Sequence, residues 1–304
     1  MYIPSGYYRK KALDALKGHW QTALLIALIV NLPTLLMQGF SVFSGNDLTD
    51  RLQAVVVSAS RDGVMTPQLI LDEMNAILYS TGFWTIRGLE LLAWLITPCL
   101  SLGMYKWLIN RLRGLDDPVS AVFCRMKLFL KAIGLQLMII LKVLLWMLPG
   151  IAAMIATMIP LFRAGDTQAQ LAALQSGYSM TLPILLLIAV PGVMAALRYG
   201  LSEFIMADAP ESRILGCIRH SMELMKDQKK FLFFLMLSFL LWYLLELLIS
   251  SFLTGVLSLV FQMLAGLALS VYVACSVAAF YLRLEDAYTK HESPDAEPGP
   301  EELN

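Results

Sequence analysis

The chain has 304 residues, of which 58% are hydrophobic and 15% are charged, and its mean hydropathy is +0.67. This apolar share is above that of ordinary soluble domains, and a formal net charge of zero favours no nucleic-acid partner. The composition therefore argues against a soluble enzyme and predicts that lipid is the protein's solvent.

Six apolar runs are long enough to cross a bilayer, which requires about 20 residues of helix. We expect helices, because a helix satisfies its own backbone hydrogen bonds in lipid. The expected fold class is all-α, a polytopic membrane bundle of about six transmembrane helices over 1–284, followed by an acidic, disordered cytoplasmic tail at 285–304. The runs are 22–43, 89–109, 128–161, 181–206, 231–252 and 256–284.

Lysine and arginine are distributed unevenly between these runs. Most of the 23 basic residues lie before the first run, between the second and third, between the fourth and fifth, and after the last. The positive-inside rule then predicts both termini on the cytoplasmic side of a bacterial plasma membrane. The first run lacks a small-residue cleavage site, so we expect a retained span and not a signal peptide.

The connection 44–86 is predicted to lie outside the cell and to contain helix. Leu48, Leu52 and Val55 share one helical face, and Asp62-Gly63 marks a turn. A helical hairpin is expected here, with a functional cap and simple packing on the membrane surface as open alternatives.

A short amphipathic segment with basic residues precedes the first, third and fifth runs. The first begins at Ser5, and the others follow Asp116-Asp117-Pro118 and Asp208-Ala209-Pro210, which are helix start signals. We therefore predict three repeats of an interfacial helix plus two spans. The basic residues of these segments form a predicted cytoplasmic collar that faces anionic lipid headgroups. The collar consists of Arg9, Lys10, Lys17, Arg125, Lys127, Arg213, Arg219, Lys226, Lys229 and Lys230.

Small residues recur at every fourth position in the second, fourth and sixth runs. Such stripes let helix backbones approach closely in lipid. They comprise Ala93, Thr97 and Ser101; Gly192, Ala196 and Gly200; and Gly266, Ser270, Ala274 and Ala278.

Four ionisable residues within the apolar runs are candidates for positions inside the membrane, namely Lys142, Arg198, Glu203 and Glu246. A charge at the centre of a bilayer costs about 2.5 to 3.5 kcal/mol on insertion scales, so each is a candidate functional residue. Lys142 and Glu246 could pair across the bundle, or each could extend to a nearby interface. Arg198 could instead pair with Asp208 and fix the surface helix.

Helix-breaking residues occur in most runs, and the candidates are Pro33, Pro149, Gly150, Pro191 and Gly192. Breaks of this kind can expose backbone carbonyls to a binding cavity, although proline is also frequent in ordinary membrane helices. In the third run, Pro149-Gly150 predicts a kink, a tilt or a division into two helices.

Three stretches resemble a known family. They are RKKALDALKGHWQTALLIAL at 9–28, VPGVMAALRYGLSEFIMADAP at 190–210 and SMELMKDQKKFLFFLMLSFLLW at 221–242. The family is a bacterial integral-membrane family of unknown function, domain of unknown function family 975, and it is distantly similar to the membrane domain of some glycerophosphodiester phosphodiesterases. The resemblance implies a multi-span membrane protein and no known activity. Asp227 departs from the pattern, because a glycine is usual before the next span. The matching positions are Pro191, Gly192, Tyr199, Asp208, Pro210, Ser221, Met225, Phe239, Trp242 and Tyr281.

Catalytic and metal-binding motifs are missing from the sequence. It has no H-E-x-x-H, no G-x-S-x-G and no phosphate-binding glycine loop, and its three histidines fall on the predicted cytoplasmic side. We therefore expect no enzyme activity, no cofactor and no metal. The leading hypothesis is a non-enzymatic accessory or scaffold that acts through lipid or a membrane-protein partner. A small-solute or peptide transporter is the alternative, and a membrane-embedded lipid-acting enzyme is less favoured.

Overall fold

The computed structural model describes residues 5–43, 81–163 and 167–292, together with Val57, Asn75 and Tyr79. Within these ranges every element is a helix, which confirms the all-α prediction. Most of the predicted outside loop at 44–86, and the tail beyond residue 292, fall outside the described residues. The elements are α1 (Ser5–Leu16), α2 (Trp20–Phe43), α5 (Thr81–Leu112), the 3₁₀ helix η1 (Val119–Leu128), α6 (Phe129–Arg163), α7 (Thr167–Tyr199), α8 (Ser202–Asp208), α9 (Ile214–Leu224), α10 (Lys229–Phe252) and α11 (Gly255–Glu292).

Six stretches of helix are long and apolar enough to span a membrane, as predicted from the sequence. They lie in α2, α5, α6, α7 with α8, α10 and α11. The protein is therefore a multi-pass membrane protein. α11 continues to Glu292, so its last turns include residues that we assigned to the tail.

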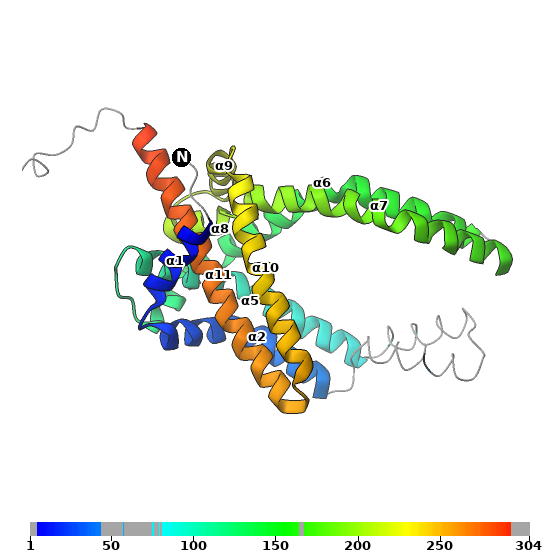
Figure 1. The fold of residues 1–304 in the computed structure, drawn as a ribbon, viewed down its shortest axis with the longest axis horizontal. Helices are drawn as coiled ribbons and strands as arrows, with labels where there is room; N and C mark the ends of the chain where they lie inside the picture. Colours follow the sequence, from blue (N-terminus) through cyan, green and yellow to red (C-terminus); the bar gives the residue numbers. More distant parts are fainter. Residues whose placement is uncertain are drawn as a thin grey trace, which may run out of the picture.

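The spans form two groups that diverge from one end of the molecule (Figure 1). α2, α5, α10 and α11 lie together, whereas α6 and α7 form a long hairpin that projects away from them. Only 6% of the residues in the apolar stretch Val119–Thr157, which comprises η1 and most of α6, are buried, against 50% in that of α11. The hairpin therefore presents most of its surface to lipid.

Close packing within the hairpin depends on Gly150. A Cβ atom at this position would lie 2.4 Å from Cγ1 of Ile188 and 2.9 Å from its backbone nitrogen, so only glycine fits. α6 continues through Pro149-Gly150 and is one helix, which settles the open question about the third run. α2 and α7 likewise continue through Pro33 and through Pro191-Gly192.

The interruption in the fourth span lies elsewhere than the sequence suggested. α7 ends at Tyr199 and α8 begins at Ser202, so the predicted run 181–206 is not one continuous helix. Gly200 lies at the break, where its low helix propensity favours a turn. After the break, Phe204 and Met206 of α8 are buried against the rest of the bundle.

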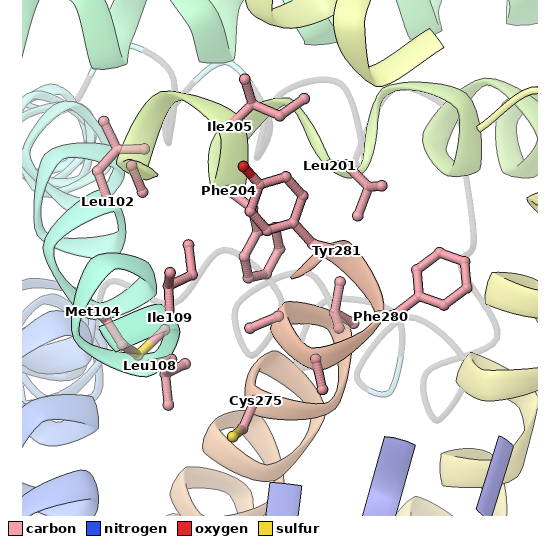
Figure 2. Close-up of a cluster of buried hydrophobic side chains, with 14 of the residues drawn as sticks. Leu102, Met104, Leu108, Ile109, Leu201, Phe204, Ile205, Cys275, Phe280 and Tyr281 are labelled. Carbon is pink, nitrogen blue, oxygen red and sulfur yellow. The ribbon is translucent and has the colours of Figure 1, made fainter. Parts of the chain in front are cut away.

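The best-packed region lies where α8 meets α5 and α11 (Figure 2). Phe204 stacks on Tyr105 with 4.4 Å between ring centroids, and Trp107 is almost fully buried nearby. The core is thus concentrated at the end from which the spans diverge. Its labelled members in Figure 2 are Leu102, Met104, Leu108, Ile109, Leu201, Phe204, Ile205, Cys275, Phe280 and Tyr281.

Short helical elements occupy the three positions predicted for interfacial helices, namely α1, η1 and α9. η1 is a 3₁₀ helix and packs directly on α5, because Gly103 has no side chain. A Cβ atom at Gly103 would lie 1.8 Å from the carbonyl oxygen of Val122. The threefold repeat itself stays a prediction.

Candidate functional site

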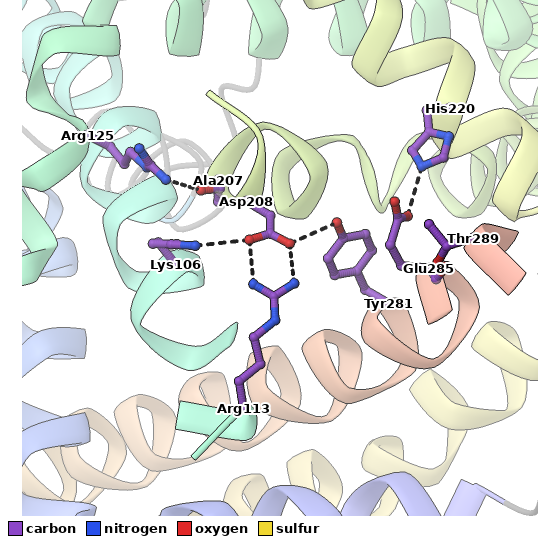
Figure 3. A network of polar contacts seen from close by, with 9 residues as sticks. All are labelled: Lys106, Arg113, Arg125, Ala207, Asp208, His220, Tyr281, Glu285 and Thr289. Atoms are coloured by element: carbon purple, nitrogen blue, oxygen red, sulfur yellow. Dashed lines mark hydrogen bonds and ion pairs between the residues drawn. The ribbon is translucent and has the colours of Figure 1, made fainter. Parts of the chain in front are cut away.

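One carboxylate joins three elements at the well-packed end of the molecule (Figure 3). Asp208, the last residue of α8, accepts hydrogen bonds from Nζ of Lys106 at 3.0 Å and from both terminal nitrogens of Arg113 at 2.7 and 2.6 Å. The hydroxyl of Tyr281 lies 3.4 Å from its second oxygen. Asp208 thereby connects α8 to the end of α5 and to α11.

Two further cations hold the backbone on either side of Asp208. A terminal nitrogen of Arg125 donates to the carbonyl oxygen of Ala207 at 2.7 Å, and Nζ of Lys131 donates to that of Pro210 at 3.0 Å. These carbonyls follow or end α8 and would otherwise lack helix partners. We call Lys106, Arg113, Arg125, Lys131, Asp208 and Tyr281 the Asp208 cluster.

Arg113 lies just beyond the membrane-spanning part of α5. Its hydrogen bonds to Asp208 raise the pKa of the guanidinium, while partial burial opposes this rise. The guanidinium therefore keeps its charge at any physiological pH. Deprotonation of Arg113 therefore does not release Asp208, and the Asp208 cluster is a permanent structural connection.

The four predicted intramembrane charges do not converge on one site. No ion pair joins Lys142 to Glu246 among the described residues, and Asp208 pairs with Lys106 and Arg113 in place of Arg198. The carboxyl group of Glu203 lies near the hydroxyl of Tyr105. Among the described residues, no ion pair therefore joins any two of these four charges.

A cavity of about 720 Å³ lies among α2, α5, α7, α10 and α11. The predicted small-residue stripes border it, through Ser101, Ala196, Gly200, Ser270 and Ala274. Those stripes thus line a space in addition to bringing helices together. None of the four intramembrane charges and none of the five helix-breaking residues lines this cavity.

Three polar side chains of the cavity bond to their own helices. The side chains of Asn31, Thr97 and Ser270 donate to the carbonyl oxygens of Ala27, Ala93 and Leu267 at 2.8 Å each. Most of the side chains that line the cavity are apolar, so it offers chiefly apolar surface.

A second space, of about 700 Å³, lies between α7 and the start of α10. We call it the α7–α10 groove. Its walls are apolar, and Lys229 and Lys230 stand at one end beside Asp227. Val193, Leu197 and Phe233 line both this groove and the central cavity, so the two spaces are neighbours.

Most of the predicted collar is exposed. Arg9, Arg125 and Lys229 are half-buried, and Arg125 is turned inward to Ala207. Among the described residues, none of the exposed collar side chains takes part in an ion pair. The exposed members are Lys10, Lys17, Lys127, Arg213, Arg219, Lys226 and Lys230.

Lys106, Arg113 and Lys131 were not singled out from the sequence. Lys106 and Arg113 are about 100 residues from Asp208 along the chain, and a basic segment between two spans gives only a topology signal. The available signal was Asp208 itself with Tyr281, because both match the family pattern described above. In the part of the chain that the structure describes, no group of three His, Cys, Asp or Glu residues could hold a metal ion.

Comparison with known proteins gives one match. A family model described as "Protein of unknown function (DUF975)" matches residues 5–288. No curated protein and no solved structure matches the chain.

Proposed function

Because the chain belongs to this family of unknown function over residues 5–288, we propose its role from geometry and charge: it is a non-enzymatic component of a bacterial plasma membrane that binds anionic lipid through its basic collar. The proposal places both termini on the cytoplasmic side. The resemblance to the membrane domain of glycerophosphodiester phosphodiesterases stays a prediction, and we propose no phosphodiesterase activity from it.

The observation that carries the proposal is that most collar side chains are exposed and lie in no ion pair among the described residues. Arg213 just before α9, Arg219 on α9 and Lys226 just after it are exposed and lie in no ion pair with a described residue. Each lysine or arginine near an anionic membrane surface contributes about 1 kcal/mol of attraction. Several such residues beside apolar spans suit a surface that rests on lipid headgroups.

The test is lipid selectivity in reconstituted membranes. The variant Lys127→Gln, Arg213→Gln, Arg219→Gln, Lys226→Gln would be placed in nanodiscs of phosphatidylglycerol and phosphatidylcholine, and spin-labelled lipids would report which lipid contacts the protein. We expect the preference for phosphatidylglycerol to fall by about tenfold or more.

The matched control removes the same charge from the predicted opposite face, with Arg51, Arg61, Arg87 and Arg163 changed to Gln. This variant should keep the preference. Equal selectivity in the wild type and the collar variant would remove the proposal.

Transport of a small solute is a second candidate, favoured by the cavity of about 720 Å³ among five spans. A water-filled path would let a membrane-impermeant thiol reagent reach Ser270→Cys or Ala274→Cys in a variant without native cysteines. We expect no labelling, because the cavity surface is chiefly apolar. Rapid labelling from one side would make transport the leading function.

A further inference from the structure

We infer that the α7–α10 groove holds one anionic phospholipid, with its phosphate at Lys229 and Lys230 and its acyl chains along the apolar wall. This inference rests on the proposed function and adds a defined site to it. The collar alone would attract many lipids loosely, whereas a groove with both a charged end and an apolar wall would retain one.

The wall of the groove is apolar and accessible. Val190 is 57% exposed, Val193 and Met194 are each 45% exposed, and Phe233 is 41% exposed. The volume of about 700 Å³ lies within the roughly 300 to 1,000 Å³ typical of small-molecule sites. It accommodates a headgroup with the first part of the chains, whose remainder would lie in the bilayer beside the diverging α6–α7 hairpin.

The charge at the end of the groove suits an anion. Lys229 and Lys230 lie in no ion pair with a carboxylate among the described residues. Both stand in the first turn of α10, where the helix dipole is unfavourable for a cation. Asp227 lines the same groove and opposes an anion, so the two lysines outnumber one carboxylate. A bound phosphate would relieve the repulsion that the lysines meet there.

The apolar wall selects a lipid over a free phosphate. A free anion would engage the lysines and leave Val190, Val193 and Phe233 facing water or unspecific lipid. A phospholipid satisfies both parts of the groove, because its phosphate would bind the two lysines while its acyl chains cover the apolar wall.

The test compares two kinds of groove variant with a charge-matched neighbour. The full-length protein would be purified in mild detergent with phosphatidylglycerol, and native mass spectrometry would count the lipids that remain during stepwise delipidation. One groove variant combines Lys229→Gln with Lys230→Gln. The other is Val190→Trp, in which the larger side chain occupies groove space beside the exposed apolar wall. The control is Arg219→Gln with Lys226→Gln, which removes two charges outside the groove.

We expect the wild type and the control to retain one phosphatidylglycerol, and both groove variants to lose roughly tenfold in occupancy. Thermal unfolding of every variant checks that the fold persists. If the lysine variant alone lost lipid and Val190→Trp kept it, the apolar wall would play no part and the inference would be overturned in favour of a bare anion site.

Two other outcomes separate this inference from the proposed function. Equal loss in the control and the lysine variant, with no effect of Val190→Trp, would place lipid binding on the collar as a whole; the proposed function would stand and the groove would not. Unchanged lipid retention in every variant would overturn the groove site, whereas the proposed function is overturned only by equal selectivity in the nanodisc test.

Discussion

Asp227 has an unfavourable backbone conformation in the turn that joins α9 to α10. It has a φ of 62° at the turn between α9 and α10, a left-handed conformation that favours glycine. The family resemblance led us to expect a glycine here. The structure makes the tight turn nevertheless, because aspartate tolerates this conformation better than most residues.

We therefore expect Asp227→Gly to stabilise the protein by up to about 1 kcal/mol, measured as a rise in the midpoint of thermal unfolding. Asp227→Asn serves as the control, since it removes the charge and keeps the conformational preference, and it should change stability little. A gain with asparagine equal to that with glycine would mean that charge, and not backbone strain, is the cause.

Two cysteines, one on η1 and one on α9, should differ in reactivity. Cys217 on α9 is fully buried, whereas Cys124 on η1 is exposed. Burial raises the pKa of the Cys217 thiol, and the nearby backbone hydrogen bond and Lys131 lower it only in part. Iodoacetamide at pH 7 should label Cys124 and leave Cys217 unmodified until the protein unfolds, as read by peptide mass spectrometry.

The raised pKa also predicts a pH effect on stability. The folded state holds the Cys217 proton more tightly than the unfolded state, so this contribution is complete below the usual cysteine pKa of about 8.5 and is lost as pH rises through the folded value. Cys217→Ala should flatten the decline in unfolding midpoint above that pH. An identical decline in the variant would assign it to other groups.

At the scale of elements, Gly103 determines how η1 packs on α5. A methyl group there would overlap the backbone of Val122, which cannot move without displacing η1. We expect Gly103→Ala to lower stability by about 1 to 3 kcal/mol, as overpacking does. Gly88 lies on the same helix with nothing within 4 Å of a Cβ atom, so Gly88→Ala should be neutral or stabilising by up to about 1 kcal/mol. Thermal unfolding of the two variants, compared side by side, distinguishes local packing from helix propensity.

The Asp208 cluster connects α5, α8 and α11, and loss of its central carboxylate should weaken the packing among these three helices. Asp208→Asn leaves Lys106 and Arg113 partly buried without a carboxylate, and we expect a loss of about 1.5 to 3 kcal/mol. Glu90→Gln breaks the more exposed pair with Arg87 and should cost at most about 1 kcal/mol. Limited proteolysis between α8 and α9 provides a second measurement, because it should accelerate only in Asp208→Asn. Equal stability of the two variants would contradict a structural role for the cluster.

For the whole molecule, the features that depend on local pattern could be predicted and those that depend on distant contacts could not. Run length and hydropathy predicted six spans, and the Asp-Pro start signals predicted the positions of η1 and α9. The break at Gly200 was missed because α8 turns inward to bury Phe204 against Tyr105, a contact that no local pattern encodes. The Asp208 cluster was missed for the same reason, since its cations come from another part of the chain.

The placement of the termini gives a prediction for the molecule as a whole. Tyr8 of α1 packs against Phe280 of α11 and accepts a hydrogen bond from Arg283, so both ends of the described chain lie at one end of the molecule. We therefore expect them to share one side of the membrane. The positive-inside rule predicts that this side is cytoplasmic, because the exposed collar residues are expected there. A green fluorescent protein fused after residue 304 should therefore fluoresce, and alkaline phosphatase inserted near residue 60 should be active. The opposite pattern would indicate that the collar and the α7–α10 groove lie at the outer leaflet.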